Sequence, residues 1–195
     1  MSQLDSSRAD AADSDAGNLP APEAVLEELG AQLNDQSLLA ASDRDVWLFA
    51  YDLLLDQSTI SRFIKGLQET KIVRLPHYRL EWPYFHRLVG TALPSLARSN
   101  QPADEVWGLL YECTGRDFDT LERYLRVPNR YRRTTVQVHD RGGRRIPAFT
   151  YVLSLRDDTP SLPARAYLDQ LTATARERKL PEEWIAKLAS AGSEG

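Results

Sequence analysis

Residues 46–54 read Val-Trp-Leu-Phe-Ala-Tyr-Asp-Leu-Leu. An apolar run of this length is typical of a strand that is buried on both faces. The run ends in a tyrosine and a turn, and a helical pattern then begins at Ser58, with a cap expected at Asp56 or Ser58. The helical spacing is carried by Ile60, Phe63, Ile64 and Leu67. A loop between a strand and a helix often holds a ligand, because backbone N–H groups are free there.

The rest of the chain alternates between strand and helix patterns. Strands are predicted at 71–82 with a break near Pro76, at 90–93, 104–111, 131–139 and 146–153, with a hairpin turn at 140–143. Helices are predicted after a cap at Asp117 or Asp119, after Pro160 and Pro163, and from Pro181. This order predicts an α+β fold with a mixed, mostly antiparallel sheet, flanking helices and a helical C-terminus.

Composition narrows the classes of protein. The chain has 195 residues, a formal net charge of −4, a pI near 5.5 and one cysteine. An acidic chain of this kind is not expected to bind nucleic acid, and no stretch approaches the ~20 apolar residues of a membrane span. A single cysteine suits a reducing compartment, so we expect a cytoplasmic protein.

Three segments are expected along the chain. Residues 1–21 are an acidic tail that is too polar to fold. Residues 22–41 carry an apolar stripe at helical spacing, formed by Val25, Leu26, Leu29 and Leu33. This helix is expected either to pack on the flank of the domain or to dock a partner protein. Residues 44–192 form the folded domain.

Five short patterns occur in an order that resembles a known family. Residues 49–51 resemble the start of a Tyr-Gly-Ser-Asn loop, and 104–111 resemble a central strand. Residues 121–127 with Tyr131 resemble a Leu-Asp-x-x-Glu-Gly-Val helix and its downstream tyrosine. Residues 150–152 and 160–184 resemble a closing strand and a C-terminal helical segment that includes Tyr167 and Trp184. Together they resemble the gamma-glutamylcyclotransferase-like, or AIG2-like, family from about residue 46 to residue 188.

The resemblance implies a fold and a reaction. The fold is a mixed, mostly antiparallel sheet or barrel with flanking helices. In the reaction, the α-amine of a γ-glutamyl group attacks its own γ-carbonyl, which releases an amine or amino acid and leaves 5-oxoproline. The glutamate of the helix motif is the general base, and backbone N–H groups of the loop bind the α-carboxylate. The reaction needs no metal and no cofactor, and none is expected here.

Both functional motifs depart from the family pattern. Leu125 stands at the position of the general base and cannot take a proton. The loop reads Tyr51-Asp52-Leu53-Leu54, so Asp52 replaces the glycine and places a carboxylate where the substrate carboxylate would lie. Asp52 therefore favours an amine or another cation as ligand, unless it caps the backbone of the loop.

The candidate site residues follow from these positions. Asp52 and Glu122 are the candidate catalytic carboxylates, because Glu122 lies one helical turn before Leu125. The candidate substrate-binding residues are Tyr51, Asp52, Leu53, Leu54, Trp82 and Tyr131. Cys113 is expected to be buried and inert. The arginines between Arg123 and Arg133 are expected to form a solvated face, with an anion site as the alternative.

Three hypotheses about function remain open. In the first, the chain keeps the pocket of the fold but not the glutamyl chemistry, and has a binding or regulatory role. In the second, it is a divergent enzyme on a small amine-bearing substrate, a γ-glutamyl compound or a related amide, and uses Asp52 or Glu122. In the third, it is an ordinary cyclotransferase in which Glu122 is the base. A close pair of these two carboxylates in one cavity would favour the enzymatic hypotheses.

Overall fold

A computed structural model of the chain describes residues 46–65, 67, 70–159 and 161–192. The expected acidic tail 1–21 and helix 22–41 lie outside the described residues. The described residues fall within the range 44–192 that was expected for the folded domain.

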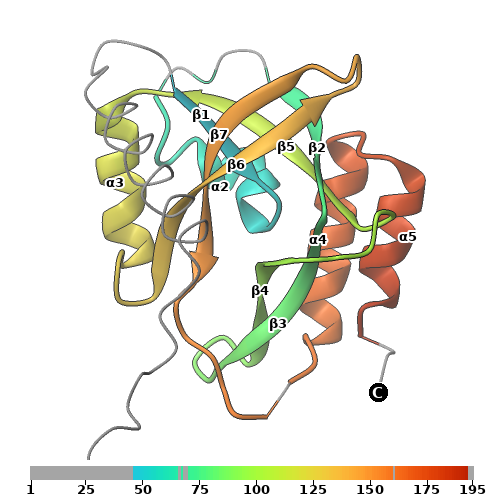
Figure 1. The fold of residues 1–195 in the computed structure, drawn as a ribbon. Coiled ribbons are helices and arrows are strands. Elements are labelled where there is room, and N and C mark those ends of the chain that lie inside the picture. The colour runs from blue at the N-terminus through green and yellow to red at the C-terminus, as the bar shows by residue number, and fades with distance from the viewer. Residues whose placement is uncertain (1–45, 66, 68–69, 160, 193–195) are drawn as a thin grey trace, which may run out of the picture.

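Five strands close into a barrel in the order β1-β5-β2-β6-β7 (Figure 1). They are β1 (Val46–Ala50), β2 (Lys71–Pro76), β5 (Glu105–Cys113), β6 (Tyr131–Asp140) and β7 (Arg145–Leu153). Only the pair β1–β7 is parallel; the other four neighbours run antiparallel. This confirms the predicted α+β fold with a mixed, mostly antiparallel sheet.

A separate two-stranded sheet is formed by β3 (Tyr78–His86) and β4 (Thr91–Arg98). The predicted strand at 71–82 is thus two strands, and the break between them falls at His77, whose φ is +61°. The strand predicted at 90–93 extends to Arg98. Pro94 is tolerated inside β4 because this strand has a hydrogen-bonded neighbour on one side only.

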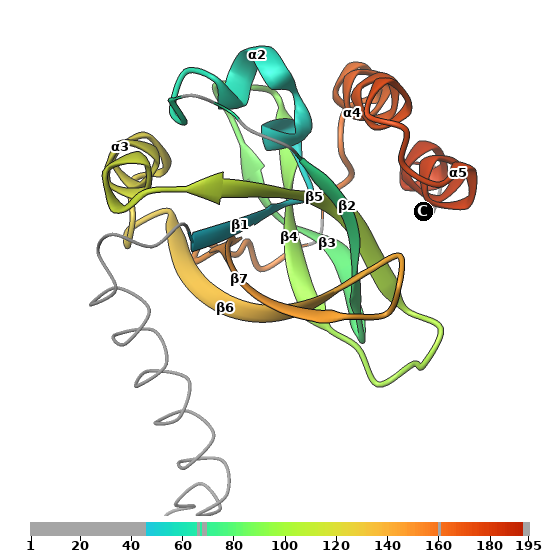
Figure 2. The ribbon, with the colours of Figure 1, turned by 90° about the horizontal axis from the view of Figure 1, so that it is seen from above.

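The helical elements are η1 (Leu53–Leu55), α2 (Gln57–Ile60), α3 (Gly115–Leu125), α4 (Arg165–Glu177) and α5 (Glu182–Ser190). Figure 2 shows α3 on one side of the barrel and the pair α4–α5 on the opposite side, with α2 between them. Helix α4 contacts both α5 and η1. The turn after β1 therefore lies where the barrel meets the C-terminal helices.

The helix predicted from Ser58 through Leu67 is wrong in length. Only one turn, α2, is helical, and Asp56 caps it by accepting from the N–H of Thr59 at 2.8 Å. Phe63 and Ile64 are buried as expected, but in turns. The N–H of Lys65 donates to Asp117 of α3 at 3.3 Å, so the backbone is bonded to α3 instead of continuing a helix.

The cap predicted for the helix that follows β5 is also wrong. Thr114 is the N-cap of α3, and its hydroxyl accepts from the N–H of Asp117. Asp117 in turn accepts from the N–H of Thr114, which completes a capping box. Asp117 is therefore the third residue of α3 and not its cap, and Asp119 lies within the helix.

Candidate functional site

The turn after β1 is folded into the 3-10 helix η1, where an open loop was expected. Asp52 is the N-cap of η1, and its Oδ1 accepts from the N–H of Leu54 at 3.0 Å. Leu53 is half-buried, and the side chain of Leu54 is buried in the core. The capping role that the sequence left open for Asp52 is thus realised, and Leu54 contributes its backbone N–H and not an exposed side chain.

Three buried hydroxyls tie the surroundings of this turn together. Tyr51 donates to the carbonyl of Tyr151 at 2.8 Å, and Thr150 donates to the carbonyl of Phe49 at 2.9 Å. Tyr111 donates to the carbonyl of Leu55 at 3.2 Å, at the end of η1. The position of the turn is therefore set by β5 and β7, because both strands supply its hydrogen bonds.

The charge of Asp52 acts on three buried tyrosines. Tyr51 precedes Asp52, Tyr131 opens β6 and Tyr167 lies in α4; all three are less than one-tenth exposed. Burial raises the pKa of each hydroxyl, and the negative charge of Asp52 raises each pKa further. Ser95 of β4 also hydrogen-bonds to Tyr51. We call this group the Asp52 cluster: Tyr51, Asp52, Ser95, Tyr131 and Tyr167.

The pKa of Asp52 is raised as well. Its cause is burial, which the hydrogen bond from the Leu54 N–H opposes only in part. The cluster thus holds one carboxyl with an increased proton affinity among hydroxyls that stay neutral at physiological pH. Such a group can accept hydrogen bonds from an amine or hydroxyl, and the tyrosines can both donate and accept.

Leu125 is the last residue of α3, and its side chain is buried. Arg126 follows in the left-handed conformation, with a φ of +56°. This is the conformation in which glycine is preferred at the end of a helix, and the family motif has glycine at this position. The placement of Leu125 at the position of the motif's glutamate stays a prediction.

Glu122 does not pair with Asp52. Its carboxylate accepts from the hydroxyl of Tyr151 at 3.1 Å and forms an ion pair with Arg133 at 2.9 Å. The guanidinium of Arg133 lies over the ring of Phe149, 4.9 Å from the ring centre. Glu122 also lines an open depression of about 500 Å³ with four other residues: Asp119, Arg123, Arg126 and Val127. None of the contacts found in the described residues joins the two candidate carboxylates.

The comparisons with known proteins agree with this geometry. Residues 105–188, which run from β5 to α5, match the AIG2-like family. This part of the chain is therefore similar to the AIG2-like family. A comparison with curated proteins found no significant match.

Solved structures show that the chain shares a fold with cyclotransferases. A gamma-glutamyl cyclotransferase matches with a TM-score of 0.68 at 21% identity, over 75% of this chain and 88% of that one. An uncharacterized human protein, loc79017, matches with a TM-score of 0.68 at 21% identity, over 76% and 89%. A yeast cyclotransferase specific to glutathione matches with a TM-score of 0.55 at 11% identity, over 78% and 97%. At these identities the likeness shows the shared fold.

Trp82 lies next to the Asp52 cluster. Its ring packs edge-on against Tyr167 with 6.1 Å between ring centres. Trp82 also lines a separate cavity beneath α5. Tyr167 itself was noted in the sequence only as part of the C-terminal resemblance, and Ser95 was not noted at all. Nothing in the sequence around Ser95 signals a site residue.

The remaining candidates are placed as follows. Cys113 is buried, and burial raises the pKa of its thiol, which agrees with the expected inert role.

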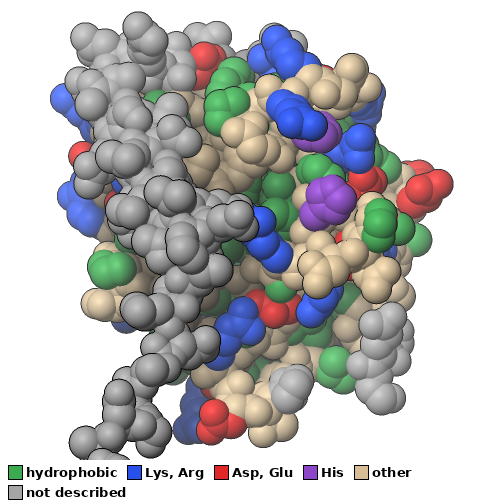
Figure 3. Space-filling model, in the orientation of Figure 1, with side chains coloured by type: hydrophobic (Ala, Val, Ile, Leu, Met, Phe, Trp, Pro, Cys, Tyr) green, Lys and Arg blue, Asp and Glu red, His purple; other side chains and the backbone are tan. Residues whose placement is uncertain are grey.

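Figure 3 shows Lys and Arg side chains interspersed with Asp and Glu on the face seen there, with histidines among them. Among the described residues, no group of three His, Cys, Asp or Glu side chains could hold a metal ion. No described helix is long and apolar enough to cross a membrane.

Proposed function

We propose that this protein is a non-catalytic, small-molecule-binding member of the AIG2-like family whose site is the Asp52 cluster. The observation that carries the proposal is the hydrogen bond from the Leu54 N–H to the Asp52 carboxylate. The resemblance implies that, in the family, backbone N–H groups of this loop bind the α-carboxylate of the substrate. Here one of those groups already holds a carboxylate of the chain itself.

The electrostatics of the cluster support a change of ligand. A γ-glutamyl α-carboxylate would have to lie beside Asp52, and two carboxylates in a poorly solvated place repel one another. An amine or a hydroxylated group would instead donate to Asp52 and exchange hydrogen bonds with Tyr131 and Tyr167. The ligand class we propose is therefore a small molecule with an amine or several hydroxyls.

The end of α3 supports the loss of cyclotransferase chemistry. Leu125 has no proton acceptor, and general-base catalysis contributes roughly 10²–10⁴-fold to such reactions. Glu122 is engaged by Arg133 and Tyr151 on the face of β6 and β7. An engaged carboxylate is a weak substitute for a base aimed at the substrate amine.

The first test is 5-oxoproline release by the purified full chain from γ-glutamyl amines, γ-glutamyl amino acids and glutathione. We expect none from the wild type. Release that Glu122→Gln abolishes would overturn the proposal and favour a cyclotransferase whose base has shifted to Glu122. Release that survives Glu122→Gln but is lost in Asp52→Asn would favour a divergent enzyme.

Binding is tested by calorimetry with small amines and polyols. We expect Asp52→Asn to weaken binding of an amine ligand about tenfold or more, because a charged hydrogen bond is lost. Asp56→Asn is the matched control, since Asp56 also caps a helix in the same segment but lies outside the cluster. Equal loss in both variants would contradict a site at Asp52.

The alternative is a divergent enzyme on an amine-bearing substrate that uses Asp52 as base. The raised pKa of Asp52 favours it, because a carboxylate with a higher pKa is a stronger base. The activity of such an enzyme would rise with pH as Asp52 loses its proton. A pH–rate profile whose acidic limb shifts in Tyr167→Phe would support this alternative, since Tyr167 faces the charge of Asp52.

A further inference from the structure

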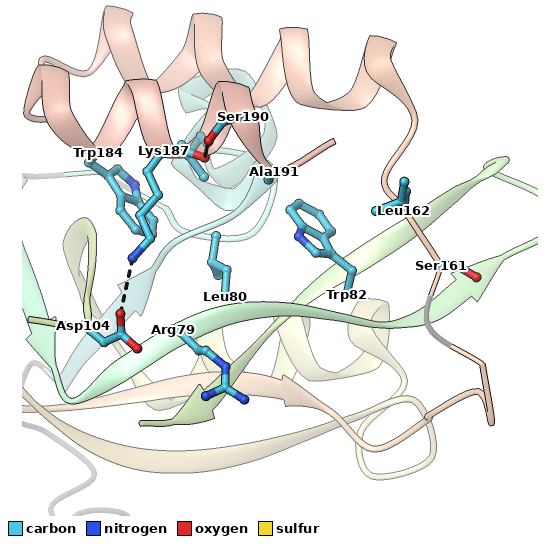
Figure 4. A pocket seen from close by; sticks show the side chains of 11 residues that line it. Arg79, Leu80, Trp82, Asp104, Ser161, Leu162, Trp184, Lys187, Ser190 and Ala191 are labelled. Carbon is cyan, nitrogen blue, oxygen red and sulfur yellow. Dashed lines mark hydrogen bonds and ion pairs between the residues drawn. The ribbon is translucent and has the colours of Figure 1, made fainter. Parts of the chain in front are cut away.

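A second cavity lies between β3 and α5, away from the turn that follows β1. Its volume is about 330 Å³, within the size range of small-molecule sites. Figure 4 shows Leu80 and Trp82 reaching into it from β3, and Arg79 of the same strand also lines it. Helix α5 closes the opposite wall with Trp184 and Leu188.

The walls of this cavity are mostly apolar, with one buried polar donor. Trp184 is 3% exposed, and its indole N–H has no acceptor among the residues that the structure describes. Leaving a buried donor without an acceptor is costly. A molecule in the cavity that carries an acceptor atom would satisfy this N–H.

One end of the cavity is charged. Lys187 of α5 forms a long ion pair with Asp104, 3.6 Å between Nζ and Oδ1, and its side chain is half exposed (Figure 4). Lys187 is not the main group that stabilises the carboxylate of Asp104. The hydrogen bond from the Ser99 hydroxyl is the largest cause of the lowered pKa of Asp104. Lys187 is therefore able to turn toward an anion in the cavity.

We propose that this cavity binds a flat, apolar molecule that carries one carboxylate. The apolar body would lie between the β3 wall, formed by Leu80 and Trp82, and the α5 wall, and the carboxylate would meet Lys187 and the Trp184 N–H. Two cationic side chains, Lys187 and Arg79, act on the single carboxylate of Asp104. This ligand class is opposite in charge to the one proposed for the Asp52 cluster.

The test uses a matched pair of probes, naphthalene-2-carboxylate and the uncharged naphthalene-2-carboxamide, titrated into the full chain by calorimetry. We expect the wild type to bind the carboxylate about three- to fivefold more tightly than the amide, as a half-exposed charge pair allows. Lys187→Gln should abolish that preference. Lys65→Gln, which removes an exposed lysine elsewhere, should keep it.

A second variant tests the place of binding. Leu162 lines the cavity and is 49% exposed, so Leu162→Asp should fold normally and yet repel the carboxylate. Both variants are checked by circular dichroism before titration. Absence of binding by the wild type up to roughly 1 mM, or an unchanged preference in Lys187→Gln, would overturn the proposal. Weakened binding in Asp52→Asn would also overturn it, by placing the probe at the other site.

Discussion

At the scale of single residues, Asp52 caps the turn after β1. Its carboxylate accepts the hydrogen bond of the Leu54 N–H, at the position where the resemblance to the family implies a glycine. The same group then raises the pKa of Tyr51, Tyr131 and Tyr167. A ligand at the proposed site would therefore meet a carboxyl of the chain.

Asp52→Asn should stabilise the fold at neutral pH. The folded-state pKa of Asp52 is raised, so its favourable contribution is complete below the ordinary carboxyl pKa and is lost as pH rises through the folded value. Asparagine keeps the cap, because its amide oxygen accepts from the Leu54 N–H. Thermal unfolding across pH should show a higher Tm for the variant at neutral pH and a shrinking difference toward acid. A variant less stable than wild type at neutral pH would contradict this.

At the scale of elements, the contact between β1 and β5 depends on one glycine. A Cβ on Gly108 would lie 2.1 Å from the carbonyl oxygen of Ala50 and 2.7 Å from Cε2 of Phe49. One of these atoms belongs to the backbone of β1, so the strand itself would have to move. The start of the turn that carries Asp52 is thereby linked to the packing of the barrel.

Gly108→Ala should lower the free energy of unfolding by about 3 kcal/mol, because overpacking of a fitted core is destabilising. Gly115→Ala is the matched control: a Cβ there meets no atom within 4 Å, and alanine suits the first turn of α3. Urea denaturation measures both. Similar midpoints for the two variants would show that β1 can shift without cost.

Helix α3 offers a second test, at its end. Arg126 holds a φ of +56°, which L-residues with a Cβ disfavour. Arg126→Gly should therefore be more stable than Arg126→Ala by about 1 kcal/mol. The comparison between two variants removes the effect of losing the arginine side chain. Equal unfolding midpoints would mean that the helix end relaxes out of the left-handed conformation.

Much of this arrangement could be predicted from the sequence, and the exceptions have physical reasons. The apolar run at 46–50 and the glycine turn at 142–143 are local signals, and β1 and the β6–β7 hairpin follow them. Helix α2 was predicted too long because the backbone beyond Ile64 bonds to Asp117, a tertiary contact that periodicity does not record. The Asp52 cluster could be predicted only in part, because Ser95 and Tyr167 reach it through the fold.

At the scale of the whole molecule, closure of the barrel brings residues 100 positions apart into contact. Tyr51 bonds to Tyr151, and Thr150 bonds to Phe49, across the parallel pair β1–β7. The pKa of Tyr131 is raised mainly by burial, and further by the charge of Asp52 and by Tyr124 near the end of α3. Both the turn after β1 and the end of α3 thus act electrostatically on one residue at the start of β6.

This leads to a prediction about the scaffold as a whole. Asp52→Gly frees the Leu54 N–H, and Leu125→Glu returns a carboxylate to the end of α3, so the double variant should release 5-oxoproline from a γ-glutamyl amine. Because a positioned base contributes roughly 10²–10⁴-fold, its rate should exceed that of Asp52→Gly alone by about 100-fold. Leu125→Glu alone should stay slow if Asp52 repels the substrate carboxylate. Activity in that single variant equal to the double would show that Asp52 is no obstacle, and a folded but inactive double variant would show that the scaffold has lost more than these two residues.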